Sequence, residues 1–78
     1  MFPSKRVQSL VGRRVHVEMK GEKSVLEGVL TSADEFLNLH LSKVNELEDG
    51  ERKRQLGSVV VRGNNVVLLT PLEGRMQE

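Results

Sequence analysis

A short polar turn between two apolar runs carries the side chains best suited to recognising a ligand. Arg62 is followed by Gly63, Asn64 and Asn65, which sets one guanidinium close to two side-chain amides. Planar groups of this kind present hydrogen-bond donors and acceptors at fixed angles, and they are suited to reading a nucleobase. The turn therefore predicts a small recognition site.

The ionisable residues do not form a catalytic pattern. Five acidic residues fall in two loop regions: Asp34, Glu35, Glu46, Glu48 and Asp49. No spacing places two of them in a dry pocket beside a nucleophile, so we expect no enzymatic activity and no catalytic residues. His16 and His40 are the two histidines, and without Cys or an ordered carboxylate set they do not predict a metal site. We expect no cofactor.

Both runs that flank the turn, Val59–Val61 and Val66–Leu69, are apolar at every position. Short apolar runs joined by Gly and Asn predict two β-strands with a tight connection. A strand with one face in water alternates apolar and polar residues, so these two strands need cover on both faces. A small domain cannot easily supply that cover, and we infer that other copies of the chain supply it.

The composition also favours self-association. The chain has 78 residues and no Cys, and one domain of this size buries about 60–65% of the surface that its unfolded form exposes. Small folds usually add disulfides, a metal or self-association. Lys and Arg number 12 against 11 Asp and Glu, so any binding of nucleic acid has to be local. With two Phe and no Tyr or Trp, one subunit cannot build an extended aromatic stacking platform.

The sequence contains no sign of membrane insertion or secretion. No N-terminal apolar run resembles a signal peptide, and no stretch approaches the roughly 20 apolar residues of a membrane helix. We expect a soluble, cytoplasmic protein with no membrane partner.

The N-terminal segment, residues 1–12, is predicted to contain a helix over residues 3–11. Ser4 can cap its start, and Gly12 sits where a left-handed residue ends a helix. We interpret its Lys and Arg side chains as solvated rather than as a dedicated phosphate site.

Five antiparallel strands are predicted to follow as a barrel over residues 13–71. They cover residues 14–19, 24–31, 37–44, 59–61 and 66–69. Gly28 interrupts the second strand, as at a sharp bend or a close backbone approach, and strong bending curls a few strands into a small barrel. Pro71 ends the last strand, and residues 72–78 are predicted to form a flexible tail.

A charged hairpin joins the third and fourth strands, with Asp49-Gly50 as its turn signal. Side-chain pairing favours a three-residue loop, Asp49–Glu51, over a two-residue loop that loses those pairs. The favoured register pairs Glu48 with Arg52, Glu46 with Arg54, Leu41 with Val59 and Leu39 with Val61. We interpret the charge run as a solvated hairpin tip rather than a nucleic-acid patch.

Two segments together resemble the bipartite signature of the Sm and Sm-like (LSm) family. Gly28, Asp34 and Asn38 resemble the first motif, a strand carrying a Gly followed by Asp-x-aromatic-x-Asn. Residues 61–66 resemble the second motif, with its Arg-Gly pair. The match runs over residues 7–71, and without a long Arg-Gly-rich tail the chain looks most like an archaeal Sm-like protein.

The resemblance implies a mainly β fold, in which an N-terminal helix caps a strongly bent, five-stranded antiparallel small barrel. It implies assembly as a homo-oligomeric ring of six or seven subunits, in which strand four of one copy pairs with strand five of the next. It also implies that single-stranded, uridine-rich RNA binds at the inner rim of the central pore, in RNA processing or ribonucleoprotein assembly.

The same resemblance assigns roles to individual side chains. Phe36 stands where the family places a side chain that stacks on a base, and Arg62 would stack on the other face through its guanidinium. Asn38 would pair with the edge of uracil, and Asp34 would hold Asn38 in place without touching RNA.

Two further residues complete the implied site, with Gly63 allowing the tight turn and Asn64 adding a base or sugar contact. Six or seven such pockets on one rim would raise affinity through avidity by about 10²–10⁴-fold. Two other hypotheses stay open: a monomeric single-strand binder of the OB type, which is another five-stranded barrel, and a purely structural ring that scaffolds other proteins.

Overall fold

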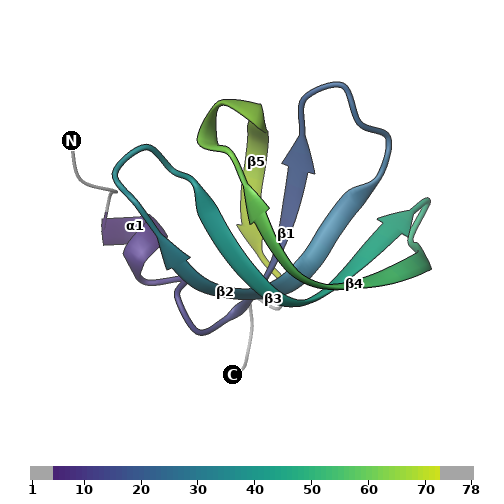
Figure 1. The fold of residues 1–78 in the computed structure, drawn as a ribbon, viewed down its shortest axis with the longest axis horizontal. Helices are drawn as coiled ribbons and strands as arrows, with labels where there is room; N and C mark the ends of the chain where they lie inside the picture. The colour runs from purple at the N-terminus through teal and green to yellow at the C-terminus, as the bar shows by residue number, and fades with distance from the viewer. Residues whose placement is uncertain (1–4, 73–78) are drawn as a thin grey trace.

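The computed structural model describes residues 5–72, and residues 1–4 and 73–78 lie outside the description. A short helix is followed by five strands, as predicted (Figure 1). In chain order the elements are α1 (Lys5–Gln8), β1 (Arg14–Met19), β2 (Val25–Ala33), β3 (Leu39–Glu48), β4 (Glu51–Val61), the 3-10 helix η1 (Gly63–Asn65) and β5 (Val66–Pro71). None of the helices in residues 5–72 has the length and apolar content that a bilayer crossing requires.

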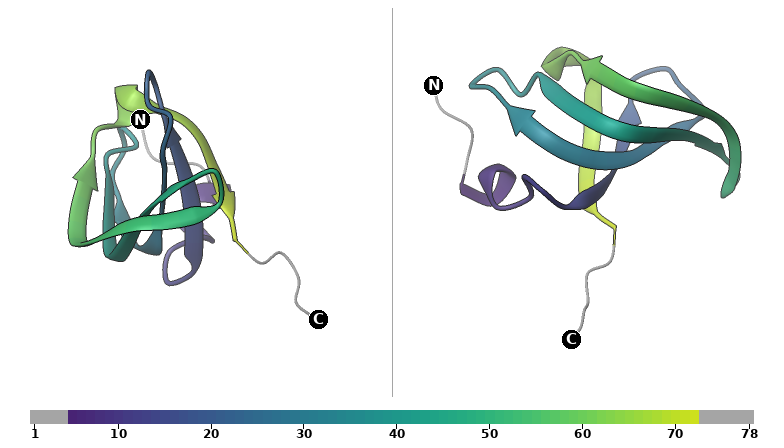
Figure 2. Two further views of the ribbon diagram at one scale, coloured as in Figure 1. Left: turned by 90° about the vertical axis from the view of Figure 1, so that its right-hand side faces the viewer. Right: turned by 60° about the horizontal axis from the view of Figure 1, so that its bottom comes forward.

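The five strands form one sheet in the order β4-β3-β2-β1-β5. Each neighbouring pair is antiparallel. The sheet bends so strongly that β5 runs across the direction of β2 and β3 (Figure 2). β4 and β5 are consecutive strands, yet they occupy the two opposite edges of the sheet and η1 spans between them. Each of these strands therefore keeps one unpaired edge within the subunit.

Apolar side chains that alternate along the central strands form the core inside the bend. Val15 and Val17 on β1 are fully buried, as their alternation predicted. Their buried partners are Leu26, Leu30, Leu39, Leu41, Val44 and Val61, and Leu10 joins them from the turn after α1. The core consists of these few residues, and burying one such side chain contributes about 1.5–3 kcal/mol to folding stability.

The helix ends earlier than the predicted residue 11, because the chain after Gln8 turns inward. Leu10 and Val11 donate their N–H groups three residues back, to the carbonyl oxygens of Val7 and Gln8, at 3.0 and 3.2 Å. The N–H of Gly12 then leaves the helical path and donates to the Leu30 carbonyl of β2 at 2.7 Å, and its φ is +91° as the left-handed prediction requires. The predicted cap Ser4 lies outside the described residues.

Gly28 marks a close backbone approach, as predicted. A Cβ added at this position would lie 2.9 Å from both the Ser42 carbonyl oxygen and the Val44 Cγ2. The register of β2 against β3 shifts at this point, between Glu27 and Val29. The absence of a side chain therefore lets β3 fold closely over β2 where the sheet bends.

The predicted three-residue loop of the charged hairpin is wrong at its tip. Glu48 pairs with Glu51 around a two-residue turn, in which Asp49 and Gly50 both have positive φ (+55° and +80°). Two residues with positive φ form the turn whose twist matches a two-residue hairpin. A register shift between Glu46 and Leu47 follows, and it restores three of the predicted pairs. These are Glu46 with Arg54, Leu41 with Val59 and Leu39 with Val61.

The end of the sheet also differs slightly from the prediction. β5 ends at Pro71, as expected, but Leu72 still donates its N–H to the carbonyl oxygen of Arg14 at 3.0 Å. Leu72 is thus attached to β1, and the remainder of the predicted tail, residues 73–78, lies outside the description.

Candidate functional site

Two loops that are far apart in the sequence meet at one end of the sheet. One joins β2 to β3 and contains Asp34 to Asn38, and the other is the turn from Arg62 to Asn65. The backbone N–H of Gly63 donates a 2.7 Å hydrogen bond to Oδ1 of Asn38. This bond ties the two halves of the predicted site to each other.

Asp34 organises the first loop through its carboxylate. Its Oδ1 accepts hydrogen bonds from the backbone N–H groups of Phe36 and Asn38, both at 2.9 Å, and its Oδ2 accepts one from Nδ2 of Asn38 at 2.9 Å. The bond from the Asn38 side chain, followed by the one from its backbone, lowers the pKa of Asp34 below its ordinary value. Asp34 is therefore ionised near neutral pH, and its contacts are those of a supporting residue.

The side-chain amide of Asn38 is held in a single orientation. Its nitrogen faces the Asp34 carboxylate, which only accepts, and its oxygen faces the Gly63 N–H, which only donates. An amide nitrogen carries two hydrogens and an amide oxygen has two lone pairs. One donor and one acceptor of Asn38 therefore remain for a ligand.

Gly63 is required for a reason that the sequence did not reveal. The prediction gave it the role of allowing a tight turn, but the described glycines with positive φ are Gly12, Gly21, Gly50 and Gly57. A Cβ at position 63 would overlap the Phe36 carbonyl oxygen and lie 2.9 Å from the Leu37 carbonyl carbon. The absent side chain lets the second loop lie directly against the backbone of the first.

The two loops enclose an open hollow of about 590 Å³. Its lining residues are Glu35, Phe36, Leu37, Asn38, Arg62 and Asn64. Phe36 is 70% exposed, so it belongs to the hollow and not to the core. Within residues 5–72 the Arg62 guanidinium forms no hydrogen bond or ion pair with another side chain, and it is exposed.

The structure thus brings together the predicted residues Phe36, Asn38, Arg62 and Asn64. Asn65, from the same turn, lines a different depression beside Met19 and Val60. Its carbonyl oxygen accepts a 2.7 Å hydrogen bond from the Lys20 N–H, which anchors the turn to the end of β1. This backbone contact has no signature in residue types, and sequence reasoning therefore missed it.

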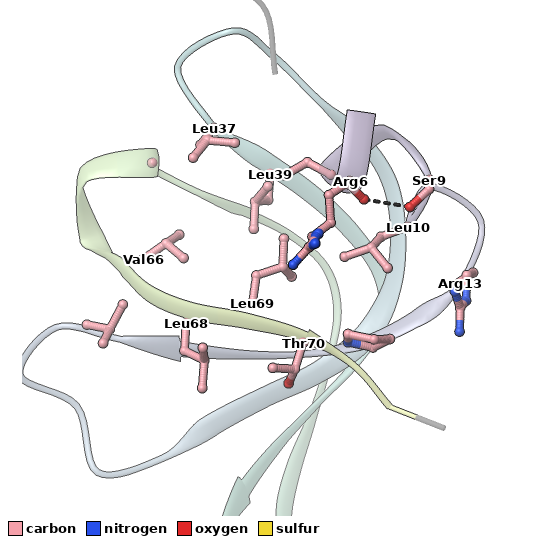
Figure 3. A pocket seen from close by; sticks show the side chains of 14 residues that line it. Arg6, Ser9, Leu10, Arg13, Leu37, Leu39, Val66, Leu68, Leu69 and Thr70 are labelled. Atoms are coloured by element: carbon pink, nitrogen blue, oxygen red, sulfur yellow. Dashed lines mark hydrogen bonds between the residues drawn. The ribbon is translucent and has the colours of Figure 1, made fainter. Parts of the chain in front are cut away.

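A second hollow, of about 730 Å³, follows the free edge of β5 beneath α1 (Figure 3). Leu37, Leu39 and Leu69 give it an apolar lining, and every residue of β5 contributes to it. On the strands themselves Val67 is 63% exposed and Val60 of β4 is also 63% exposed. The sequence prediction that these strands lack cover within one subunit is confirmed.

A bent five-stranded sheet with two free edges, whose β2–β3 and β4–β5 connections are hydrogen-bonded to each other, defines a small β-barrel of the Sm type. The chain belongs to the LSM domain family, whose model matches residues 5–71. The predicted family and fold are confirmed.

Solved structures of archaeal proteins show the same fold. An Sm-like protein from Archaeoglobus fulgidus, AF-Sm2, is 44% identical with a TM-score of 0.85, over 92% of this chain and 96% of that chain. SmAP1 of P. aerophilum, a heptamer, is 33% identical with a TM-score of 0.81, over 90% of this chain and 92% of that chain. An Sm protein from Pyrococcus abyssii was solved in complex with a uridine heptamer. It is 28% identical with a TM-score of 0.82, over 92% of this chain and 100% of that chain.

Proposed function

We propose that this chain forms a ring of six or seven identical subunits that binds single-stranded, uridine-rich RNA at the inner rim of its pore. Such a ring would act in RNA processing or ribonucleoprotein assembly. The observation that carries the proposal is the 2.7 Å bond from the Gly63 N–H to Asn38. Because of this bond, Phe36, Asn38 and Arg62 surround one hollow.

The chemistry of the hollow suits a flat pyrimidine. An exposed Phe36 ring offers one stacking face, and the Arg62 guanidinium plane offers the other. Stacking of a base on an aromatic side chain contributes about 1–3 kcal/mol. The two groups come from different loops, so a base would sit between them only while the loops stay bonded.

The fixed amide of Asn38 supports a preference for uracil over cytosine. Uracil presents an acceptor, O4, beside a donor, N3–H, and Asn38 retains one donor and one acceptor. Cytosine presents the opposite order at the same positions, an amino donor beside an acceptor nitrogen. To pair with cytosine in the same pose the amide would have to rotate, which would place its nitrogen against the Gly63 N–H and its oxygen against the Asp34 carboxylate.

The two free edges support assembly. Long apolar edges pair with other chains unless something covers them, and here Val60 on β4 and Val67 and Leu68 on β5 are exposed. The two edges differ from each other, so their pairing is head-to-tail, and a head-to-tail interface closes into a ring when its rotation permits. The relative from P. aerophilum is a heptamer of protein subunits. The relative from Pyrococcus abyssii was solved in complex with a uridine heptamer.

Light scattering with and without a short oligo-uridine tests this function, with oligo-cytidine as the matched ligand. We expect a mass of six or seven subunits and tighter binding of oligo-uridine. A mass near one chain would instead support the monomeric single-strand binder, and a large particle with no affinity for RNA would support the scaffolding ring. Absence of enzymatic activity and a cytoplasmic location stay predictions, which activity screens and cell fractionation would test.

A further inference from the structure

Leu37 belongs to both hollows of the subunit. It lines the hollow that contains Phe36, Asn38 and Arg62, and it also lines the apolar groove along β5. Figure 3 shows Leu37 at the same end of this groove as Leu39 and Val66. Among the lining residues of the two hollows, Leu37 is the one that they share.

Leu37 has an unusual backbone conformation for its residue type. Its φ is +63°, a left-handed conformation that is rare for a Leu. Its N–H donates to the Asp34 carbonyl at 3.0 Å, and the residue is 39% exposed. The residues before and after it, Phe36 and Asn38, are the ones proposed to contact the base. A contact at the Leu37 side chain would therefore reinforce the Asp34 bonds that hold the backbone of Phe36 and Asn38.

We propose that Leu37 is a positioning residue through which the neighbouring subunit organises the base-binding hollow. This inference rests on the ring proposed above. The occupant of the groove is β4 of a second copy, because the groove follows β5 over its whole length and β4 carries the other free edge.

The direction of the strands brings the end of β4 to Leu37. Pairing within the chain is antiparallel throughout, and an antiparallel continuation sets the last residues of β4, including Val60, beside the start of β5. Leu37 lies at that end, since a Cβ on Gly63 would come within 2.9 Å of its carbonyl carbon. The exposed Val60 side chain of the neighbour would then cover the exposed part of Leu37.

Coupling of this kind is reciprocal: if assembly tightens nucleotide binding, the nucleotide tightens assembly by the same factor. Uridine monophosphate is the suitable probe, because one nucleotide fills one hollow and avidity along a strand does not contribute. We expect wild-type subunits to bind it about 5- to 20-fold more tightly in the ring than after dilution below the assembly concentration.

Three variants test the role of the side chain. Leu37→Asn keeps the left-handed backbone, which Asn tolerates well, but removes the apolar contact, and we expect weaker assembly and about 5- to 20-fold weaker binding of uridine monophosphate even in assembled rings. Leu37→Met restores an apolar side chain and should approach wild type in both measurements. Lys53→Gln, in the exposed hairpin, serves as the control and should change neither.

Val60→Asp tests the same contact from the neighbour's side. Val60 does not line the base hollow of its own subunit, but it lines another depression together with Arg62. The uncharged variant Val60→Ser is therefore measured beside Val60→Asp, and a matching loss of nucleotide affinity in both would come through Leu37 of the next copy. Unchanged affinity in Leu37→Asn rings, or equal affinity in wild-type rings and dissociated subunits, would overturn the role of Leu37 and leave the proposed function standing. Wild-type protein that stays monomeric or never binds the nucleotide would overturn the proposed function itself.

Discussion

The substitution Gly63→Ala would separate the two loops of the base-binding hollow with the smallest possible change. The added Cβ would overlap the Phe36 carbonyl oxygen, and the Leu37 carbonyl carbon would lie only 2.9 Å away. Both obstacles are backbone atoms, which cannot rotate out of the way as a side chain can. The turn that carries Arg62 must therefore move outward, and the 2.7 Å bond from the Gly63 N–H to Asn38 Oδ1 breaks.

Two losses set the expected size of the effect. A part-buried N–H left without its partner costs about 1–3 kcal/mol of folding stability. In the bound complex the displaced turn also removes Arg62 from one face of the base, and it leaves the Asn38 amide held by Asp34 alone. We take this loss as similar to one stacking contact, about 1–3 kcal/mol, and each 1.4 kcal/mol is about tenfold in affinity. The affinity for uridine monophosphate should therefore fall by about 5- to 150-fold.

The matched control is Gly57→Ala, on β4. Gly57 has a φ of +75°, and a Cβ there would meet nothing within 4 Å. Its replacement should cost about 1–2 kcal/mol of stability through backbone strain alone and leave nucleotide affinity unchanged. Urea unfolding and calorimetric titration would be measured on both variants. Our explanation of Gly63 is wrong if Gly63→Ala binds the nucleotide as well as Gly57→Ala does.

Three further predictions concern the same hollow. Arg62→Ala and Asn38→Ala should each leave the ring intact but weaken oligo-uridine binding at least several-fold. Unchanged affinity in both variants would show that RNA binds elsewhere on the subunit. Phe36→Ala should lose about 1–3 kcal/mol of nucleotide binding, whereas Phe36→Tyr, which keeps the ring face, should bind nearly as wild type in the same titration. The carboxylate of Asp34 has a lowered pKa when folded, so its stabilisation of the loop is complete above the ordinary Asp value of about 3.9 and disappears as the pH falls through the lowered pKa. Asp34→Asn should reduce this acid limb of a stability profile measured by circular dichroism without abolishing it, because the hydrogen bonds from Ser24 and Arg54 also lower the pKa of Glu46. A limb of unchanged size would assign it to groups other than Asp34.

The sequence predicted those parts of the fold that depend on buried, alternating side chains. β1 was found with its bounds because Val15 and Val17 alternate with polar residues and are both fully buried. β4 was predicted only as residues 59–61, yet it begins at Glu51. Its first half is polar and exposed, and it pairs with β3 through backbone hydrogen bonds. Such pairing requires no alternation of apolar and polar residues, so the sequence pattern does not indicate a strand there.

The candidate site was predicted as a set of residue types but not as a geometry. The resemblance to the two family motifs implied Phe36, Asn38 and Arg62, which do line one hollow. The role of Gly63 depends on an approach to the Phe36–Leu37 backbone, and such an approach exists only after the two loops have folded together. Leu37 was overlooked for a similar reason, because an apolar residue at the start of a strand is ordinarily assigned to the core, whereas this one is 39% exposed.

The position of η1 explains why assembly and recognition would depend on each other in this fold. η1 joins β4 to β5, and these strands are the two opposite edges of the sheet. In the proposed ring each edge pairs with a different neighbour, so both ends of the turn that carries Arg62 are attached to a subunit interface. The turn cannot shift without disturbing at least one of those strands. The spacing between successive base-binding hollows would then be set by the interfaces, and an RNA strand would be selected for matching that spacing as well as for its bases.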